Sequence, residues 1–296
     1  MGTTTKIEWA DATANFWIGC SKVAYGCAHC YAETFAKRVG ADVWGKDKPR
    51  RFVKGVYGDL RLLNRDAIET GTRPRVFVSS LCDFFDDGDL EVVDVLGRPL
   101  FEDIAGTFRH DAEGSERLTV GRVRDAAWEV LNDCEAIDFM ILTKRPEAVR
   151  ANWKSTLAGE NIWLGVSAAT DGEYVEAFKQ LDALRHLARF TFVSAEPMVE
   201  DIRPRLGGFA GTLPPDLVIV GGESGGSARP CRVEWVRNFV RSRRQHPEGA
   251  RIFIKQLGSR VPDSIVKLED AKGGRIEEWP PDIRVRELPR GAYGAA

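Results

Sequence analysis

The chain has 296 residues, of which 43% are hydrophobic and 29% are charged, so it can bury the core of one large domain or of two ordinary ones. This composition excludes a disordered chain, and the near balance of 42 basic and 44 acidic side chains excludes a strong overall positive field, although a local basic groove stays open. The start of the chain lacks a secretory signal and no apolar run could span a bilayer, so we expect a cytoplasmic protein without a membrane partner.

Seven short apolar runs alternate with longer helical patterns along the chain. The runs cover residues 16–19, 75–80, 137–143, 161–167, 189–195, 217–221 and 251–255. Each is almost continuously hydrophobic, as in parallel strands that are covered on both faces. One helical stripe between them contains Val123, Ala127, Val130 and Cys134, and it indicates that Cys134 is a packing residue. The alternation predicts an α/β fold, either a partial TIM-like barrel or a doubly wound sheet.

Three segments lie outside this alternation. Residues 41–74 and 84–119 are longer than a simple helical crossover, and we interpret them as insertions that form functional lids or offer a surface for a protein partner. The second begins with an acidic run, which by itself is typical of a solvated face. We expect residues 1–257 to form the barrel and residues 258–296 to form an appendage packed on it, with a hairpin turn at Gly273 and Gly274.

Three of the six cysteines lie close together in the segment NFWIGCSKVAYGCAHCYAETFAKRV, as Cys20, Cys27 and Cys30. Clustered cysteines in a reducing cytosol are more often metal ligands or redox groups than disulfides. A closed zinc site needs a fourth ligand, and the candidates, which lack typical zinc spacing, are His29, His110, Cys82 and Cys231. A cubane iron–sulfur cluster on three thiolates leaves one iron open to another ligand, so three thiols suffice for it.

Small or ionisable residues follow nearly every predicted strand. Because the carboxyl ends of parallel strands meet at one edge of a sheet, we expect these residues and the cysteine loop to converge. They include Ser79, Ser80, Asp83, Lys144, Arg145, Ser167, Glu196, Glu223, Lys255 and Gln256. Any one of them is equally typical of a helix cap, so the prediction depends on their coincidence with the cysteine loop.

A set of short motifs adds a resemblance. The motifs are IEWADAT, GCSKVAYGCAHCYAE, LTKRPE at 142–147, LGVS at 164–167, SAEPM at 194–198, VGGESGGSARP at 220–230 and IKQLG at 254–258. Together they resemble a phage-associated, three-cysteine family that is similar to radical S-adenosylmethionine (SAM) enzymes and is catalogued as a domain of unknown function. The resemblance implies a partial TIM-like (β/α)6-7 barrel of the radical SAM type. The C-x6-C-x2-C spacing and His29 before the third cysteine depart from the commonest superfamily loop.

The resemblance also implies cofactors and roles. Cys20, Cys27 and Cys30 would hold a [4Fe–4S] cluster whose open iron binds SAM, and reductive cleavage would give methionine and a 5′-deoxyadenosyl radical. The SAM-binding candidates are Ser80 and Asp83 for the amino group, Ser167 for the ribose, and Lys144 or Arg145 for the carboxylate. The catalytic candidates are Glu196, Glu223 and Lys255. Cys82 and Cys231 are interpreted as packing residues, with hydrogen-atom donation or a further cluster as the alternative.

Two functions stay open at this stage. The first is a radical SAM enzyme that receives electrons from a reductant such as flavodoxin or ferredoxin. Its substrate is not identified, and a nucleobase, a nucleotide or a nucleic acid is favoured by analogy alone. The second is a non-enzymatic interaction module in which the same thiols hold zinc or an iron–sulfur cluster.

Overall fold

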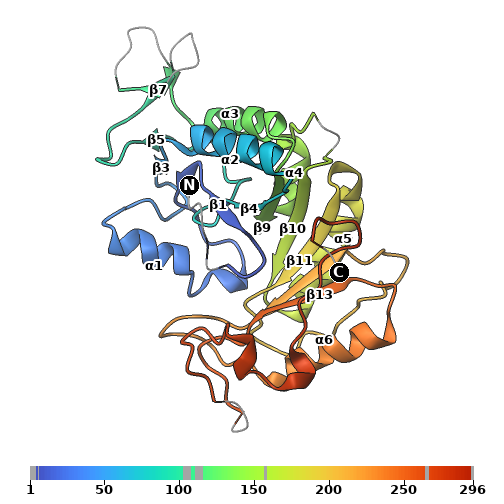
Figure 1. The fold of residues 1–296 in the computed structure, drawn as a ribbon. Helices are drawn as coiled ribbons and strands as arrows, with labels where there is room; N and C mark the ends of the chain where they lie inside the picture. The colour runs from blue at the N-terminus through green and yellow to red at the C-terminus, as the bar shows by residue number, and fades with distance from the viewer. Residues whose placement is uncertain are drawn as a thin grey trace.

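A sheet of seven parallel strands organises the protein. The computed structural model describes residue 5 and residues 7–102, 108–110, 116–156, 159–263 and 267–294. The sheet curls into a half-barrel in which strand order follows chain order (Figure 1), so the predicted α/β half-barrel is confirmed. Its strands are β1 (Ala12–Ala14), β4 (Arg75–Val78), β9 (Asp138–Thr143), β10 (Ile162–Ala168), β11 (Phe190–Ala195), β12 (Leu217–Gly221) and β13 (Arg251–Gln256).

The prediction of the first strand was wrong. Residues 16–19 do not enter the main sheet; within them β2 (Trp17–Ile18) pairs with β3 (Arg50–Phe52), which pairs with β5 (Val92–Val93) in a second sheet. The first strand of the half-barrel is β1, which pairs with β4 in parallel. Residues 16–19 carry the stronger apolar signal because they contain Phe16 and Trp17. Both side chains are fully buried in the outer core, which lies between the main sheet and the helices.

Six α-helices in the described part of the chain connect or flank the strands. They are α1 (Tyr31–Arg38), α2 (Val56–Thr70), α3 (Val120–Asp133), α4 (Pro146–Asn152), α5 (Asp171–Leu184) and α6 (Val233–Gln245). Local chemistry sets several boundaries: the Thr170 hydroxyl accepts a hydrogen bond from the Glu173 N–H at the start of α5, and Gly71 ends α2 in a left-handed conformation. Figure 1 shows α1 standing apart from α2 and α3, which lie side by side. None of the helices in the described ranges is both long and apolar enough to cross a membrane.

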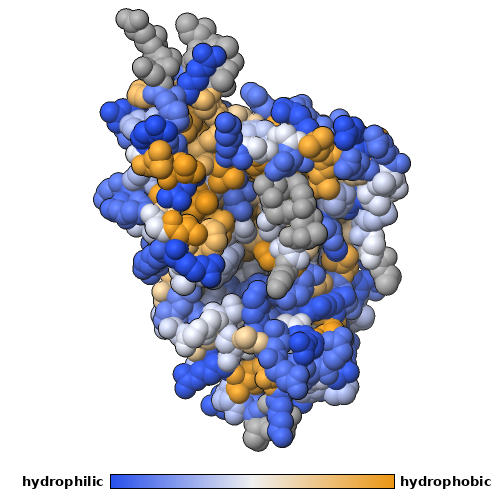
Figure 2. All heavy atoms as spheres, turned by 60° about the vertical axis from the view of Figure 1, so that its left-hand side comes forward, coloured by the Kyte–Doolittle hydropathy of each residue, from blue (hydrophilic) through white to orange (hydrophobic). Residues whose placement is uncertain are grey.

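The two predicted insertions are built on the main core. The first contains the regular helix α2, and the second contains a small sheet of β6 (Phe101–Glu102), β7 (Phe108–Arg109) and β8 (Glu116–Arg117). Val56, Leu60 and Val92 from these segments are buried in the same cluster as the strands. In the second insertion, Val95 and Leu96 are 67% and 72% exposed. Figure 2 shows apolar side chains, in orange, gathered on the upper part of the face that it displays.

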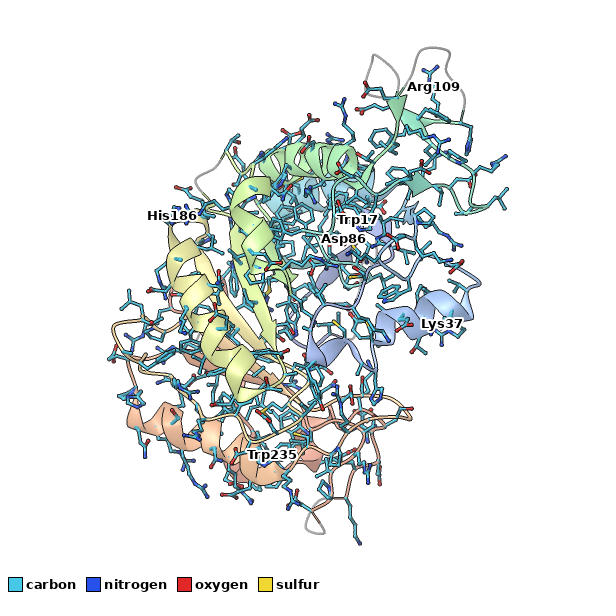
Figure 3. The ribbon with its side chains drawn as sticks, turned by 180° about the vertical axis from the view of Figure 1, so that it is seen from behind. Trp17, Lys37, Asp86, Arg109, His186 and Trp235 are labelled. Carbon is cyan, nitrogen blue, oxygen red and sulfur yellow. The ribbon has the colours of Figure 1, made fainter. Side chains whose placement is uncertain are left out.

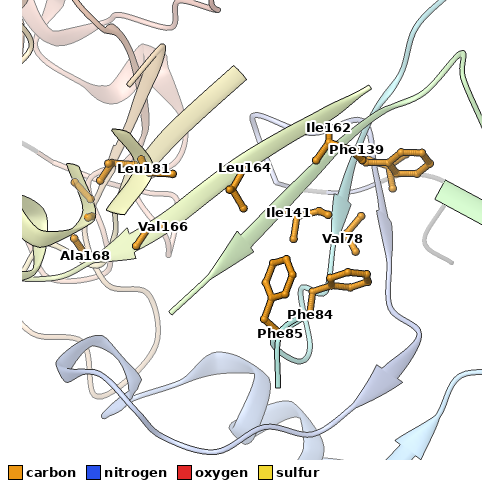
Figure 4. Close-up of a cluster of buried hydrophobic side chains, with 14 of the residues drawn as sticks. Val78, Phe84, Phe85, Phe139, Ile141, Ile162, Leu164, Val166, Ala168 and Leu181 are labelled. Atoms are coloured by element: carbon orange, nitrogen blue, oxygen red, sulfur yellow. The ribbon is translucent and has the colours of Figure 1, made fainter. Parts of the chain in front are cut away.

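Two apolar layers fix the half-barrel. The outer layer lies between the strands and the helices, where Val78, Ile141 and Leu164 from three adjacent strands pack together (Figure 4). The inner layer fills the concave side with aromatic rings, and it includes Trp9, Phe77 and Phe192. A Cβ on Gly165 would lie 2.2 Å from the Phe192 ring, so the inner layer requires a glycine on β10.

The chain after residue 257 closes one side of the barrel. Trp279 and Ile283 are buried in the outer core, and the Ile254 N–H donates to the Val285 carbonyl at 2.9 Å. Short 3-10 helices occur at η3 (Ile276–Glu278) and η4 (Pro281–Ile283). The predicted hairpin has its turn at 270–273 but no flanking strands in the described part of the tail, because the Leu257 N–H donates to the Gly273 carbonyl instead.

The inner layer yields a stability prediction. Gly165→Ala should lower the free energy of unfolding by about 1–3 kcal/mol, because Phe192 is fully buried and cannot move away from the new methyl group. Gly172→Ala is the control: it adds a methyl group to α5 where no atom lies within 4 Å, and it should be neutral or stabilising. Urea unfolding measures both, and equal effects would contradict this packing.

Candidate functional site

A cavity of about 320 Å³ opens at the carboxyl edge of the half-barrel. Its size falls at the lower end of the range for small-molecule sites. Trp9, Phe77 and Leu142 contribute apolar lining from the inner layer. All thirteen residues predicted to converge there line it: Cys20, Cys27, Cys30, Ser79, Ser80, Asp83, Lys144, Arg145, Ser167, Glu196, Glu223, Lys255 and Gln256. Their convergence follows from parallel strands that end at one edge, and their chemical roles stay predictions.

The cysteine loop lies directly against the strand ends. A Cβ on Gly26 would come within 3.3 Å of both Ala169 and Pro197, so only the bare backbone fits at this distance without a shift of its neighbours. Gly19 has a φ of 124°, and a Cβ there would lie 2.5 Å from the Val43 carbonyl oxygen. The Tyr25 N–H donates to Glu173 Oε1 at 3.0 Å, which fixes η1 (Tyr25–Cys27) to the start of α5.

Arg145 ties the loop to the end of β9. Its Nη1 donates to Cys20 Sγ at 3.6 Å, and its Nη2 donates to Ser21 Oγ at 2.8 Å. The same guanidinium pairs with Asp83 at 3.2 Å and with Asp86 at 3.1 Å. Burial opposes the charge of Arg145, but Asp83, Cys20 and Asp86 outweigh it and raise its pKa. Burial raises the pKa of the Cys20 thiol to about 12, and Asp83 adds to this shift, so the metal-free thiol keeps its proton.

Behind Arg145 lies a fully buried ion pair. Arg50 Nε donates to Asp86 Oδ2 at 2.7 Å, and Arg50 Nη1 donates to three carbonyls of residues 43–48. Arg50 is 0% and Asp86 is 2% exposed, and Figure 3 labels Asp86 near the centre of the molecule in that view. Because a buried charge without a partner costs several kcal/mol, this network holds the segment behind Cys20 in one arrangement.

The opposite end of the loop is held by Glu223. Its carboxylate accepts hydrogen bonds from Arg229 Nη2 at 2.8 Å, from the Arg229 backbone N–H at 2.8 Å and from His29 Nδ1 at 3.2 Å. Burial opposes ionisation of Glu223, but the hydrogen bonds from Arg229 and His29 prevail and lower its pKa. His29 thus links the loop to the end of β12, and Glu223 acts here as an anchor.

The remaining predicted residues divide into engaged and free groups. Lys255 Nζ donates to Glu196 Oε1 at 2.5 Å, and Ser167 Oγ donates to the Glu196 carbonyl at 3.1 Å. The Asp83 carboxylate accepts from Thr143 Oγ1 at 2.7 Å and from the Lys144 N–H at 3.0 Å. Within the described residues, the Lys144 ammonium makes no ion pair, although the Lys144 side chain lines the cavity.

The end of β4 carries two neighbouring serines with different surroundings. Asn15 Nδ2 donates to Ser80 Oγ at 2.9 Å, and the Tyr31 hydroxyl donates to the Ser80 carbonyl at 2.6 Å. Ser79 has a φ of 68° and is 3% exposed, and its hydroxyl lies beside Cys82 without a hydrogen bond of normal geometry in the described structure. A strained backbone with an unpartnered buried hydroxyl facing a cavity is typical of a ligand-binding position.

The six cysteines fall into two groups. Cys20, Cys27, Cys30 and Cys82 line the cavity as free thiols, whereas Cys134 and Cys231 are buried in the outer core, as the packing interpretation predicted. Cys82 was also interpreted as a packing residue, and it is only partly buried against that core, with one side on the cavity. Burial raises the pKa of Cys82 well above its ordinary value. Among the described residues, no three His, Cys, Asp or Glu side chains lie close enough together to bind a single metal ion.

The sequence analysis did not identify several residues of the site. Arg50, Asp86 and Asn15 act through neighbours distant in sequence, so no local pattern marks them. Arg229 was detectable, because it lies six residues after Glu223 in the motif VGGESGGSARP. Ser79 was noted only as one of two serines at a strand end.

The strain at Ser79 yields a second prediction. Ser79→Gly should raise the free energy of unfolding by about 1 kcal/mol relative to Ser79→Ala, because glycine adopts a positive φ without a steric penalty and alanine does not. Thermal or urea unfolding of the two variants measures this difference. A Ser79→Gly protein that is less stable than Ser79→Ala would refute the assignment of strain.

Comparison with models of known protein families gives a match over most of the chain. The family model described as Protein of unknown function (DUF5131) matches residues 4–112 and 117–279. Neither the curated proteins nor the solved structures give a significant match. The matched ranges contain the cysteine loop and every residue that lines the cavity. The chain therefore belongs to the DUF5131 family of proteins of unknown function.

Proposed function

We propose that this protein is a radical SAM enzyme with a [4Fe–4S] cluster on Cys20, Cys27 and Cys30. One observation carries the proposal: three free thiols from a single anchored loop line the same cavity as the polar ends of the strands. The resemblance of the motifs to radical SAM enzymes supports it by analogy. The proposal places the enzyme in the cytoplasm, where thiols stay reduced.

The donor set fits a cluster better than a single ion. In a cubane each thiolate binds a different iron atom, so its thiols stand further apart than the ligands of one zinc ion. Three cysteines that line one cavity as free thiols can supply one thiolate to each of three irons. The nearby Arg145 guanidinium supplies a positive charge and a hydrogen bond to Cys20 Sγ, which offset part of the effect of burial that keeps this thiol protonated.

When bound, such a cluster supplies one electron that cleaves SAM to methionine and a 5′-deoxyadenosyl radical. The protein itself positions and encloses the cofactors. Lys144 offers an unpaired ammonium to the SAM carboxylate, and the apolar lining from Trp9 and Phe77 excludes water from the reacting end. The proposal also requires a reductant such as flavodoxin or ferredoxin.

On the far side of the cavity, Lys255 and Glu196 can move a proton. Lys255 Nζ donates a hydrogen bond to Glu196 Oε1 with an N···O distance of 2.5 Å, and both side chains are mostly buried. A pair at this distance can give a proton to a bound substrate or take one from it. Glu223 was proposed for the same task, but its two oxygens already bind Arg229 and His29, so we now propose it as a loop anchor.

Metal analysis tests the cluster. Anaerobically reconstituted wild-type protein should contain about four irons with acid-labile sulfide, and Ala at Cys20, Cys27 or Cys30 should abolish iron binding because too few thiolates remain. Cys134→Ala and Cys231→Ala are matched controls that remove buried packing thiols and should keep full iron content. One zinc in place of iron would favour a non-enzymatic zinc-binding module.

SAM binding tests the role of Lys144. In cluster-loaded protein, Lys144→Ala should weaken SAM binding roughly ten- to a hundredfold, because it removes a charge-assisted hydrogen bond to a carboxylate. Lys144→Arg keeps the charge and should retain most of the affinity, and iron content should not change in either variant. An equilibrium titration gives the answer: equal dissociation constants for wild type and Lys144→Ala would remove Lys144 from the SAM site.

Activity decides the reaction class. Cluster-loaded protein, incubated with SAM and a strong reductant such as dithionite, should release 5′-deoxyadenosine, and the Cys27→Ala protein should not. Absence of 5′-deoxyadenosine from fully loaded wild-type protein, with or without candidate substrates, would overturn the proposed function.

A further inference from the structure

The mouth of the cavity carries exposed aromatic rings. Tyr25 is 60% and Tyr31 is 53% exposed, although both belong to the segment that holds the three cysteines. Tyr31 lines the cavity, and Tyr25 precedes Gly26, which also lines it. Aromatic rings held by a rigid loop at the entrance of a site offer flat faces to a ligand at little entropic cost.

Basic side chains surround these rings. Lys22 and Lys272 line the cavity from opposite parts of the chain, and the Arg229 guanidinium lies 5.1 Å from the centre of the Tyr25 ring. We call Lys22, Tyr25, Tyr31, Arg229 and Lys272 the aromatic-basic rim. Lys272 lies in the turn at 270–273. The Ser259 hydroxyl joins this turn to the glycine-rich motif at 220–230, because it donates to the Ala271 carbonyl and accepts from the Gly225 N–H.

The charges at the cavity do not balance. Each of its three carboxylates is paired: Asp83 with Arg145, Glu196 with Lys255, and Glu223 with Arg229. Lys22 is paired with Glu33 at 2.8 Å. Lys144 and Lys272 form no ion pair within the ranges that the structure describes, so the cavity and its rim keep positive charge in a chain whose formal net charge is −2. This local excess favours an anionic ligand.

The cavity volume places the substrate at the rim. About 320 Å³ is the volume of a site for one small molecule, and a bound cofactor would fill it. A substrate therefore reaches the reacting end from the mouth, where it meets Tyr25, Tyr31 and Lys272 before any deeper residue.

We propose that the aromatic-basic rim binds single-stranded nucleic acid, with bases on the tyrosine rings and phosphates near Lys272 and Lys22. Alternating aromatic faces and cations are the recognition chemistry of single strands, in which stacking tolerates any base and cations follow the backbone. A duplex hides its base faces, and an acidic peptide has no flat ring for each tyrosine. As a substrate assignment this rests on the proposed function, whereas binding at the rim is measurable without it.

Binding is measured by the fluorescence anisotropy of labelled oligonucleotides of about 12 nucleotides, as single-stranded DNA, single-stranded RNA and duplex DNA, with the full-length protein. Single strands should bind more tightly than the duplex, and binding should weaken as salt rises from about 50 to 200 mM. Single strands that bind no more tightly than the duplex, or not at all, would overturn the inference.

Matched variants locate the binding. Tyr25→Ala should weaken single-strand binding roughly tenfold, and Tyr25→Phe should retain it, because the ring and not the hydroxyl stacks on a base. Tyr293→Ala is the control, since Tyr293 is 53% exposed at the far end of the chain and should have no effect. Equal effects of Tyr25→Ala and Tyr293→Ala would remove the rim from the binding surface.

The salt dependence isolates the phosphate contact. The slope of the logarithm of the binding constant against the logarithm of the salt concentration is negative. Lys272→Ala should make this slope less negative by about 0.7, the value for one lost contact to a single strand. Lys179→Ala, at an exposed lysine of α5, should leave the slope unchanged. An unchanged slope for Lys272→Ala would contradict the role of Lys272. Oligonucleotide binding without SAM cleavage would support nucleic-acid binding by the rim and refute the radical SAM proposal. SAM cleavage without oligonucleotide binding would support the radical SAM proposal and refute nucleic-acid binding by the rim.

Discussion

The buried guanidinium of Arg145 is the contact on which the geometry of the site depends. It joins Asp83 and Asp86 to the backbone and side chain of Ser21 and to the thiol of Cys20. Its loss would leave two carboxylates buried with too few partners, at a cost of several kcal/mol, so the network has one favourable arrangement. A lysine could not replace it, because only a planar fork of five donors reaches these groups together.

The cysteine loop is fixed at both ends by charges and in the middle by contact. Arg145 holds its start, the pair of Glu223 and His29 holds its end, and Gly26 packs against the strand ends between them. A loop restrained in this way loses little further conformational entropy when its thiols take ligands, which favours tight binding. The ion pairs that restrain it leave the thiols themselves free.

Parallel-strand topology made much of this predictable. Six of the seven predicted strands enter the main sheet in chain order, and the strand-end residues converge on one cavity as that topology requires. The first strand was missed because β1 has the sequence Ala-Thr-Ala, which carries little apolar signal, while the adjacent Phe16 and Trp17 fill the core from a different sheet. Propensity gave the wrong strand because tertiary packing decided between two adjacent segments.

Charge and position alone could not separate anchors from free groups. Lys144 and Arg145 are adjacent and both basic, yet Arg145 points to Cys20 and Lys144 stays unpaired among the described residues. Ser79 and Ser80 differ in the same way. Asn15 Nδ2 donates a hydrogen bond to the Ser80 hydroxyl, whereas the Ser79 hydroxyl has no hydrogen bond of normal geometry among the described residues. Which neighbour is engaged depends on contacts from Ser21 and Asn15, more than 60 residues away in each case.

This division gives the site its chemical logic. Asp83, Arg145 and Glu223 form their hydrogen bonds with other groups of the protein. They therefore fix the position of the cysteine loop and have few donors or acceptors available for a ligand. Ser79, Lys144 and Lys272 keep theirs among the described residues, and at Ser79, which is buried and has a strained backbone, an unused polar group is costly to the free protein. That cost is recovered when a ligand supplies the missing partner, so the free groups, more than the strongly paired ones, mark where ligands of this cavity bind.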